Sequence, residues 1–275
     1  MRSSKLWVQI SNESMIRFCT LFSSSGGNCA FVSDGSTNLL VDAGVSASKI
    51  VNALESIGVS PGEIDGILVT HEHSDHVSGI GVLTRKYNIP VYVNEATLSG
   101  FENTSSAPSP LCVHTITTGS SFDIRSANVR SFKTSHDSRE SVGYTITMEG
   151  RKLGIATDTG CVTKPLLSAL AGCEAVIIEA NHDIDMLNKG MYPYPLKKRI
   201  LSDTGHLCNE NCAWLATQLA IWGTKHIVLG HLSDNNNTPD KAYDAVHKML
   251  TENNFEIYKD VYLTVAMRSE ITEII

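Results

Sequence analysis

The sequence predicts an α/β (α+β) protein in which two β-sheets pack face to face and helices cover both outer surfaces, a four-layer αββα sandwich. Strand-like segments occur in blocks in both halves of the chain, and segments with the apolar spacing of helices separate and follow them. The 275 residues, 42% hydrophobic and 19% charged, suffice for one large core. We therefore expect a single domain over residues 15–275. Residues 1–14 are interpreted as a variable extension, with Met15 as an alternative natural start.

The first half of the chain opens with strand-like segments over residues 16–43, in which Asp34-Gly35 has the composition of a hairpin turn. A helix is predicted next, because Ser46 can cap its first turn, apolar residues follow at helical spacing, and Gly58 can end it. The same two periodicities predict the remaining elements: strand, polar turn, helix and strand over 64–93; a loop over 101–110; strands within 120–158; helices near 164–171, 210–222 and 239–251; and strands at 174–179, 226–230 and 255–266.

Three histidines and an aspartate crowd into one turn of six residues, 71–76, with the sequence HEHSDH. The turn follows the apolar run 66–69 directly, so a strand delivers it to one edge of a sheet. Neutral imidazole and carboxylate groups are the ligands expected for zinc, manganese or iron. The turn therefore predicts a metal site.

Further histidines and aspartates stand where other predicted strands stop, each next to small residues. Sheets covered by helices gather ligands at strand ends, so these side chains are expected to meet the metal turn. They are Asp42, His136, Asp158 and His231.

The order of these residues over nearly the whole chain resembles the five motifs of the metallo-β-lactamase superfamily. Within it, the chain resembles the YycJ (WalJ) group of bacterial metallo-hydrolases. One departure is Cys208, where that group usually has serine after His-Leu. The segments that carry the narrower resemblance are 22–29, 179–183, 192–200, 205–207 and 230–236.

The resemblance implies an αββα fold with two divalent metal ions, of zinc, manganese or iron, at the mouth between the sheets. Two such ions close together acidify a bridging water, which gives hydroxide near neutral pH. Asp75 is a candidate for the catalytic machinery as well as a ligand, and Asp42 is expected to position a ligand histidine or its loop. A turn-capping carboxylate is the alternative for Asp42. The implied ligands are His71, His73 and His136 for one metal, Asp75, His76 and His231 for the other, and Asp158 as the bridge.

Two further histidines are candidates for donating a proton to the leaving group, because histidine titrates near neutral pH. His206 is preferred since it precedes the helix predicted at 210–222, and His182 is the alternative. Small polar side chains near glycines are candidates for binding substrate phosphate, although simple turns explain them equally well. The candidates are Ser24, Ser25, Asn28, Asn181, Asn235 and Asn236.

The resemblance implies phosphodiester hydrolysis, with DNA degraded as by a 5′→3′ exonuclease. The net charge of −7 does not by itself suggest nucleic-acid binding. However, the basic run 197–199 can follow a phosphate backbone, and Tyr192 and Tyr194 can stack on bases. The alternatives are a small-molecule hydrolase acting on a thioester, lactone or cyclic phosphodiester, and a non-catalytic metal-dependent module. The complete ligand set argues against the module.

Seven scattered cysteines with no CxxC pattern predict a reducing, cytoplasmic location. No apolar run is long enough to cross a membrane, and no feature calls for an obligate protein partner. A further zinc site formed by His206, Cys208 and Cys212 is a weaker alternative, because the sequence offers no fourth ligand nearby.

Overall fold

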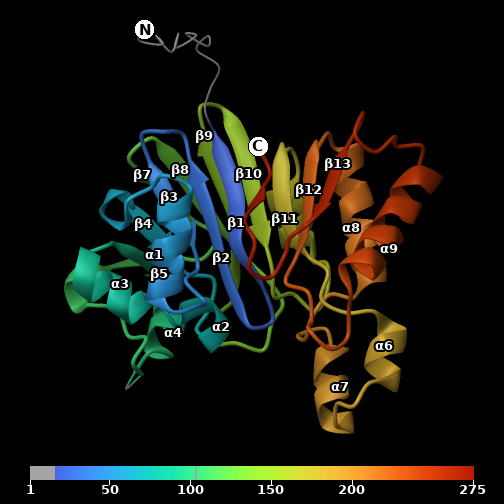
Figure 1. Cartoon of the computed structure of the whole chain (residues 1–275), viewed down its shortest axis with the longest axis horizontal. Helices are drawn as coiled ribbons and strands as arrows, with labels where there is room; N and C mark the ends of the chain where they lie inside the picture. Colours follow the sequence, from blue (N-terminus) through green and yellow to red (C-terminus); the bar gives the residue numbers. More distant parts are fainter. Residues whose placement is uncertain (1–15, 103) are drawn as a thin grey trace, which may run out of the picture.

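The computed structural model describes residues 16–102 and 104–275. The expectations for the extension 1–14 and for Met15 lie outside these residues. Within them, two seven-stranded sheets pack face to face (Figure 1). The first sheet has the order β14 (Thr272–Glu273), β1 (Arg17–Ser24), β2 (Gly27–Ser33), β3 (Asn38–Val41), β4 (Gly66–Leu68), β5 (Val91–Asn94) and β6 (Val113–Ile116). The second has the order β13 (Tyr262–Val265), β12 (His226–Gly230), β11 (Ala175–Glu179), β10 (Arg151–Ala156), β9 (Val142–Met148), β8 (Ala127–Lys133) and β7 (Ser121–Ile124).

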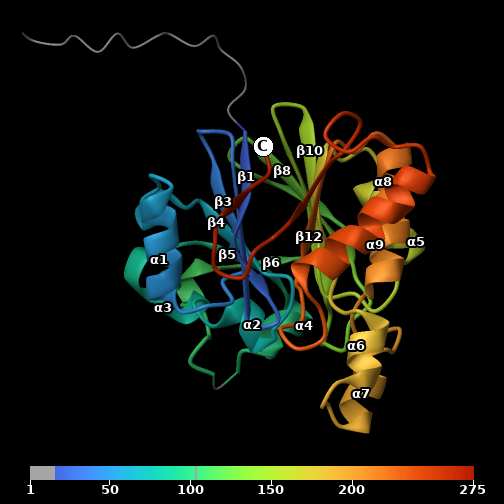
Figure 2. The same ribbon diagram turned by 45° about the vertical axis from the view of Figure 1, so that its right-hand side comes forward.

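Helices cover the outer face of each sheet, which confirms the predicted αββα layering (Figure 2). The first sheet carries α1 (Ala47–Ser56) and α3 (Ile80–Tyr87), and the second carries α5 (Lys164–Leu170), α8 (Asn209–Ile221) and α9 (Pro239–Glu252). Short helices gather at one end of the sandwich: α2 (Ser74–Val77), α4 (Glu95–Ser99), α6 (Ile184–Lys189) and α7 (Tyr194–Ile200). Two 3-10 turns complete the set, Pro61–Glu63 and Pro110–Cys112. None of the helices in the described parts of the chain is long and apolar enough to span a membrane.

Buried apolar side chains fill the space between the sheets. Phe18 and Leu39 from the first sheet meet Val129, Tyr144 and Ile177 from the second, and each is completely or almost completely buried. Alternate residues of each strand point into this layer, while the other face of the strand packs under the helices.

Most predicted elements are confirmed, including the hairpin turn, in which Gly35 has a φ of 84°. Ser46 does stand at the N-terminus of α1, but its side chain makes no capping hydrogen bond. The prediction of a strand over 255–266 is mostly wrong, because only Tyr262–Val265 is extended. Positive φ values at Asn254 and Tyr258 turn the chain before that strand. The helices α4, α6 and α7 were not predicted, since five to seven residues show little helical periodicity.

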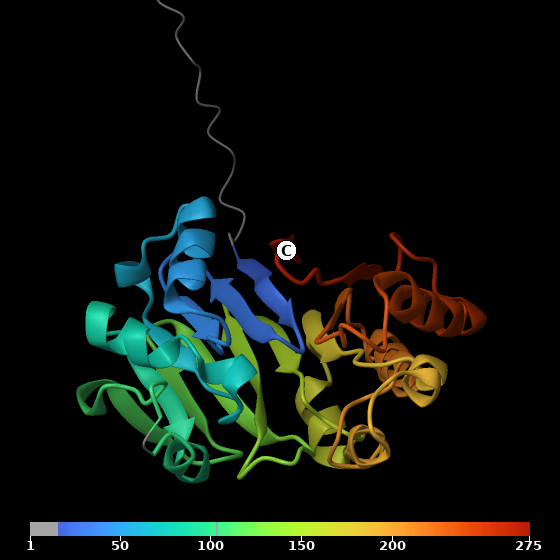
Figure 3. The same cartoon turned by 60° about the horizontal axis from the view of Figure 1, so that its bottom comes forward.

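The topology brings the chemically active strand ends to one edge of the sandwich. Strands β3, β4 and β5 run parallel to one another, and so do β10, β11 and β12. Their carboxyl ends open toward the side on which the short helices gather, which Figure 3 turns toward the viewer. The metal turn after β4 therefore lies opposite the ends of β10, β11 and β12.

Candidate metal centre

The metal turn packs its imidazole rings against each other in the interior. The ring centroids of His71 and His76 lie 4.2 Å apart, and those of His71 and His73 lie 4.6 Å apart. Both His71 and His76 are completely buried. Asp75 and His76 lie on α2, whose single turn reverses the chain, so residues separated by only a few positions point toward one centre.

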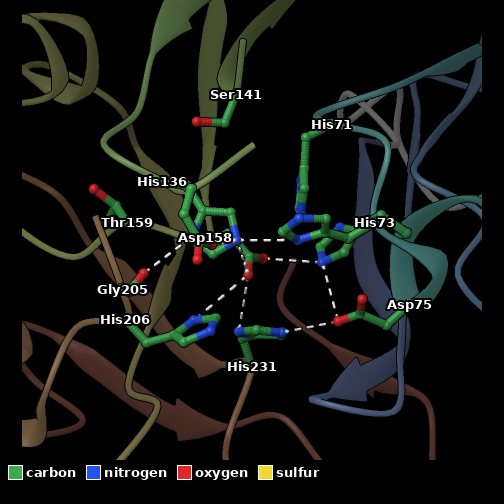
Figure 4. A network of polar contacts seen from close by, with 12 residues as sticks. His71, His73, Asp75, His136, Ser141, Asp158, Thr159, Gly205, His206 and His231 are labelled. Atoms are coloured by element: carbon green, nitrogen blue, oxygen red, sulfur yellow. Dashed lines mark hydrogen bonds and ion pairs between the residues drawn. The ribbon is translucent and has the colours of Figure 1, made fainter. Parts of the chain in front are cut away.

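The structure brings all seven predicted ligands together at this edge. Figure 4 labels these residues with the exception of His76. Every residue of each group can place one donor atom within 4.8 Å of the others. The groups are His71, His73 and His136; Asp75, His76 and His231; His71, His76 and Asp158; and Asp158, Glu179, His206 and His231. Asp158 adjoins both sides, because its carboxylate lies 2.9 Å from His76 Nε2 and 3.5 Å from His136 Nε2.

Unpartnered polar atoms show that this cluster suits a cation. His71 Nε2 is buried and makes no hydrogen bond to any described residue, and burial keeps the pKa of His71 well below its usual value. A buried neutral nitrogen without a donor is costly unless a metal accepts its lone pair. Burial opposes ionisation of Asp158, but His231 and His76 outweigh it and hold the pKa of Asp158 well below normal. The cluster thus offers the neutral imidazole nitrogen of His71 beside the ionised carboxylate of Asp158.

Asp42 fixes the orientation of the metal turn from the neighbouring strand. Its carboxylate accepts hydrogen bonds from Thr70 N and Thr70 Oγ1, each at 2.8 Å, and lies 2.7 Å from His76 Nδ1. This leaves His76 Nε2 to face the cluster. Gly44 is required two residues later, because a side chain there would collide with the backbone oxygen of Asp75, 1.7 Å from the position of Cβ.

Glu179, at the end of β11, orients two histidines at once, a role that the sequence did not suggest. Its Oε1 lies 2.8 Å from His206 Nδ1 and 2.8 Å from His231 Nδ1, while its Oε2 accepts hydrogen bonds from Thr159 N and Leu207 N. The side chain is completely buried. Burial raises its pKa, but the two histidines lower it more, to about 2. The sequence feature that could have identified Glu179 is its position as the one acidic residue at the end of an otherwise apolar strand.

The carboxylates of the centre favour positive charge on His231. Burial lowers the pKa of this histidine, whereas Asp158, Asp75 and Glu179 raise it, to about 10 in total. His136 is positioned differently, since its Nδ1 lies 3.0 Å from the carbonyl oxygen of Gly205 and its Nε2 is left toward the cluster. In both cases the partner at Nδ1, Glu179 for His231 and the Gly205 carbonyl for His136, leaves Nε2 to face the ligands.

Three residues of the centre adopt a backbone conformation that is uncommon for residues other than glycine. Asp42, Asp158 and His231 have φ values of 62°, 54° and 56°, and each directly or closely follows a strand. Aspartate and histidine tolerate this left-handed region better than most residues. Such strain at three strand ends is typical of a functional site held in place by its surroundings.

A cavity of about 220 Å³ opens onto the cluster. Its walls include the predicted proton donor His206 and two of the predicted substrate contacts, Ser25 and Asn181. It also contains Arg199, whose guanidinium is paired with Asp137, with Nη2 2.9 Å from Oδ1. Sequence reasoning had noted Arg199 only as part of the basic run. The complete lining is Ser25, His73, Asp75, Asp158, Asn181, Tyr192, Leu196, Arg199, Ile200, His206, His231 and Ser233.

Four of the predicted substrate contacts do not line this cavity. Ser24 and Asn28 lie in the tight β1–β2 hairpin, where Asn28 Nδ2 donates to the carbonyl oxygen of Ser24 and lies 3.1 Å from His76 Nε2. Asn236 is buried and bonds to Ser233 Oγ, and Asn235 donates to Tyr192 Oη. The hairpin and loop use these polar groups internally, as turns commonly do.

His182 also lies away from the cavity wall. It is almost completely buried, both ring nitrogens lack a hydrogen-bond partner among the described residues, and burial lowers its pKa to about 4. A neutral imidazole at this position is not suited to deliver a proton to the leaving group, so His182 is better described as a core residue. The alternative zinc site at Cys208 and Cys212 gains no support, because no ligand group among the described residues includes a cysteine.

Comparison with known proteins gives consistent results. Residues 37–232 match the family described as Beta-lactamase superfamily domain. Exodeoxyribonuclease YycJ of Bacillus anthracis is 39% identical over 250 residues, which cover 88% of this chain and 92% of that protein. Exodeoxyribonuclease WalJ of Streptococcus pneumoniae is 37% identical over 238 residues, covering 86% and 88%. The crystal structure of the metallo-beta-lactamase fold protein YhfI from Bacillus subtilis matches with a TM-score of 0.73 and 16% identity, over 94% of this chain and 99% of that one.

Proposed function

The chain belongs to the beta-lactamase superfamily and, within it, to the YycJ/WalJ exodeoxyribonuclease family, and on that premise we propose that it hydrolyses phosphodiester bonds of DNA as a 5′→3′ exonuclease. The observation that carries the proposal is the convergence of seven histidine and aspartate side chains in one cluster. Four of them line the cavity: His73, Asp75, Asp158 and His231. The names of the two relatives supply the substrate class. A cytoplasmic location is part of the proposal and rests on the scattered cysteines.

The chain's own residues would hold two divalent metal ions. The three-histidine group fits one ion, the group with Asp75 fits the other, and Asp158 reaches both. Imidazole and carboxylate donors without thiolate are compatible with zinc, manganese or iron. Bound there, the ions would supply acidified water and stabilise the negative charge that develops on the attacking and leaving oxygens.

Residues around the ligands would donate the proton and bind the phosphate group. Glu179 holds His206 through Nδ1, so the other ring nitrogen is available to donate a proton to the leaving oxygen. Arg199 presents a planar guanidinium in the same cavity, where it can bind a nonbridging phosphate oxygen. Asn181 is held by the carbonyl oxygen of His231, which fixes its position in the cavity wall.

The test uses a DNA duplex labelled at either the 5′ or the 3′ end, with added manganese or zinc. A 5′→3′ exonuclease releases the 5′ label at once as a mononucleotide, whereas the 3′ label stays on progressively shorter chains. Asp158→Asn is expected to abolish release. The same substitution at the exposed Asp244 on α9 serves as the matched control and keeps wild-type activity. Absence of nucleotide release together with turnover of a lactone or thioester would refute the proposal in favour of a small-molecule hydrolase.

A further inference from the structure

The helices α6 and α7 form a projection beside the metal centre, and the proposed function so far uses only its base. In Figures 1 and 2 the two helices extend below the body of the sandwich, on the side of the strand ends. Leu196, Arg199 and Ile200 of α7 line the metal cavity. The projection is thus continuous with the site in which the reaction takes place.

A second cavity, of about 520 Å³, lies on the other side of α7. Tyr192 lines both cavities, so its half-buried side chain lies between the two. The remaining lining comes from the two helices and from the two residues that follow α7: Asn188, Tyr194, Lys197, Lys198, Leu201 and Ser202.

Two cations of the second cavity have no carboxylate partner. Among the described residues, neither Lys197 nor Lys198 forms an ion pair, whereas the neighbouring Lys189 pairs with Asp185. Lys197 Nζ donates to the carbonyl oxygen of Asn188, which holds the ammonium group at the cavity wall. Lys198 is exposed. In a chain with a net charge of −7, two uncompensated ammonium groups beside a hydrolytic centre favour an anionic ligand.

The projection also exposes an aromatic side chain. Tyr194 is 77% exposed although it lines the second cavity. Aromatic rings next to cationic side chains are the means by which proteins bind single-stranded nucleic acid without sequence preference, since bases stack on the rings and phosphates meet the cations. The metal cavity of about 220 Å³ is smaller than typical pockets for drug-sized ligands, which start at about 300 Å³, and has no room for stacked base pairs.

From these observations we infer that the α6–α7 projection binds the single-stranded part of the nucleic-acid substrate and leads it past Tyr192 to the metal centre. The inference rests on the proposed function. It adds that the substrate is single-stranded where it enters the site. Tyr194 stacks on a base, and Lys197 and Lys198 contact phosphates of the strand that remains bound. The duplex part of the substrate lies outside the metal cavity.

The test measures binding of a fluorescent single-stranded oligonucleotide with phosphorothioate linkages, which resist hydrolysis, to the metal-loaded protein. Tyr194→Ala is expected to raise the Kd on the order of 5- to 150-fold. The double variant Lys197→Gln/Lys198→Gln is expected to reduce the slope of log K against log salt by about 1.4, two contacts of about 0.7 each. A blunt, fully paired hairpin should show smaller losses with both variants.

Matched substitutions outside the projection separate this surface from general charge and aromatic effects. The control variants are Lys248→Gln, on α9, and Tyr258→Ala, at an exposed tyrosine. Both are expected to bind the oligonucleotide like the wild type. Wild-type affinity in the Tyr194 and lysine variants would overturn the inference, and equal losses on single strand and blunt hairpin would overturn its claim about strand state. Failure of the proposed function gives a different result. In that case the wild type releases no nucleotide, whatever effect the substitutions in the projection have on binding.

Discussion

Replacing Glu179 with glutamine tests whether this buried carboxylate positions the metal centre. The carboxylate receives four N–H groups, two histidine Nδ1 atoms on one oxygen and two backbone amides on the other. Glutamine has the same shape but only one acceptor oxygen. Whichever way its amide turns, an NH₂ group faces N–H donors and at least two of the four hydrogen bonds are lost.

The size of the effect follows from these contacts. If the glutamine oxygen stays with the histidines, the amides of Thr159 and Leu207 lose their acceptor, at a cost of about 1–3 kcal/mol each. The free energy of unfolding should therefore fall by about 2–6 kcal/mol. Loss of the negative charge also weakens the hydrogen bond to His231 Nδ1. Loss of such a hydrogen bond to the non-ligating nitrogen of a ligand histidine typically reduces metal affinity by about 10- to 100-fold.

Two measurements check these values: zinc affinity by competition with a chelating dye, and urea unfolding of the metal-loaded protein. Glu174 provides the control, because it stands just before the same strand, at the opposite end, and pairs with Arg151 at the surface. Glu174→Gln should leave zinc affinity unchanged. If Glu179→Gln binds zinc within twofold of the wild type, the carboxylate does not orient the ligand, and the assignment of a positioning role is wrong.

Three other substitutions test neighbouring parts of the structure. His73→Ala should lower bound metal, measured by plasma mass spectrometry, and abolish hydrolysis; an unchanged metal content would contradict its place among the ligands. Asp42→Asn should reduce metal affinity by about 10- to 100-fold through the misoriented His76, and wild-type affinity would reduce Asp42 to a turn residue. For His182, the folded-state pKa of about 4 lies below the usual value of about 6.5, so the unfolded chain binds more protons between these values, and stability present above pH 6.5 is lost as the pH falls toward 4. His182→Asn should therefore remove about 2 kcal/mol of the stability difference between pH 7 and pH 5, seen by urea unfolding at both pH values; an equal difference in both proteins would contradict the buried, neutral histidine.

The sequence was sufficient to predict the sandwich and the proximity of the site residues. Both depend on a pattern that recurs along the chain, an apolar strand that ends at a histidine or an aspartate. Apolar strands stopping at Asp42, Asp158 and His231 mark the carboxyl ends of parallel strands, and parallel strands bring those ends to one edge. The left-handed backbone at the same three residues explains why aspartate and histidine, with small neighbours, stand there.

The remaining features depend on three-dimensional contacts that no local pattern records. Glu179 is chemically distinctive only once His206 and His231 are seen to share its oxygen. Asn28 and Asn236 were predicted to contact phosphate because they belong to runs of small polar residues, but each forms hydrogen bonds within its own turn. His182 shares its residue type with the ligands, and only its position, outside the ligand groups and the cavity lining, distinguishes it.

The negative charge of the chain is compatible with an anionic substrate, because several of its carboxylates lie at the metal centre. Asp42, Asp75, Asp158 and Glu179 place four carboxylates in and around one cluster, and two divalent cations carry the same charge with opposite sign. If two divalent ions bind as proposed, the formal net charge would change from −7 to −3, and the whole change would occur at the cluster. A phosphodiester would then meet Arg199 and neutralised carboxylates instead of bare ones. An overall negative charge therefore does not argue against DNA as substrate, because the local field at the site is decided by the metal ions and by the cations of α7.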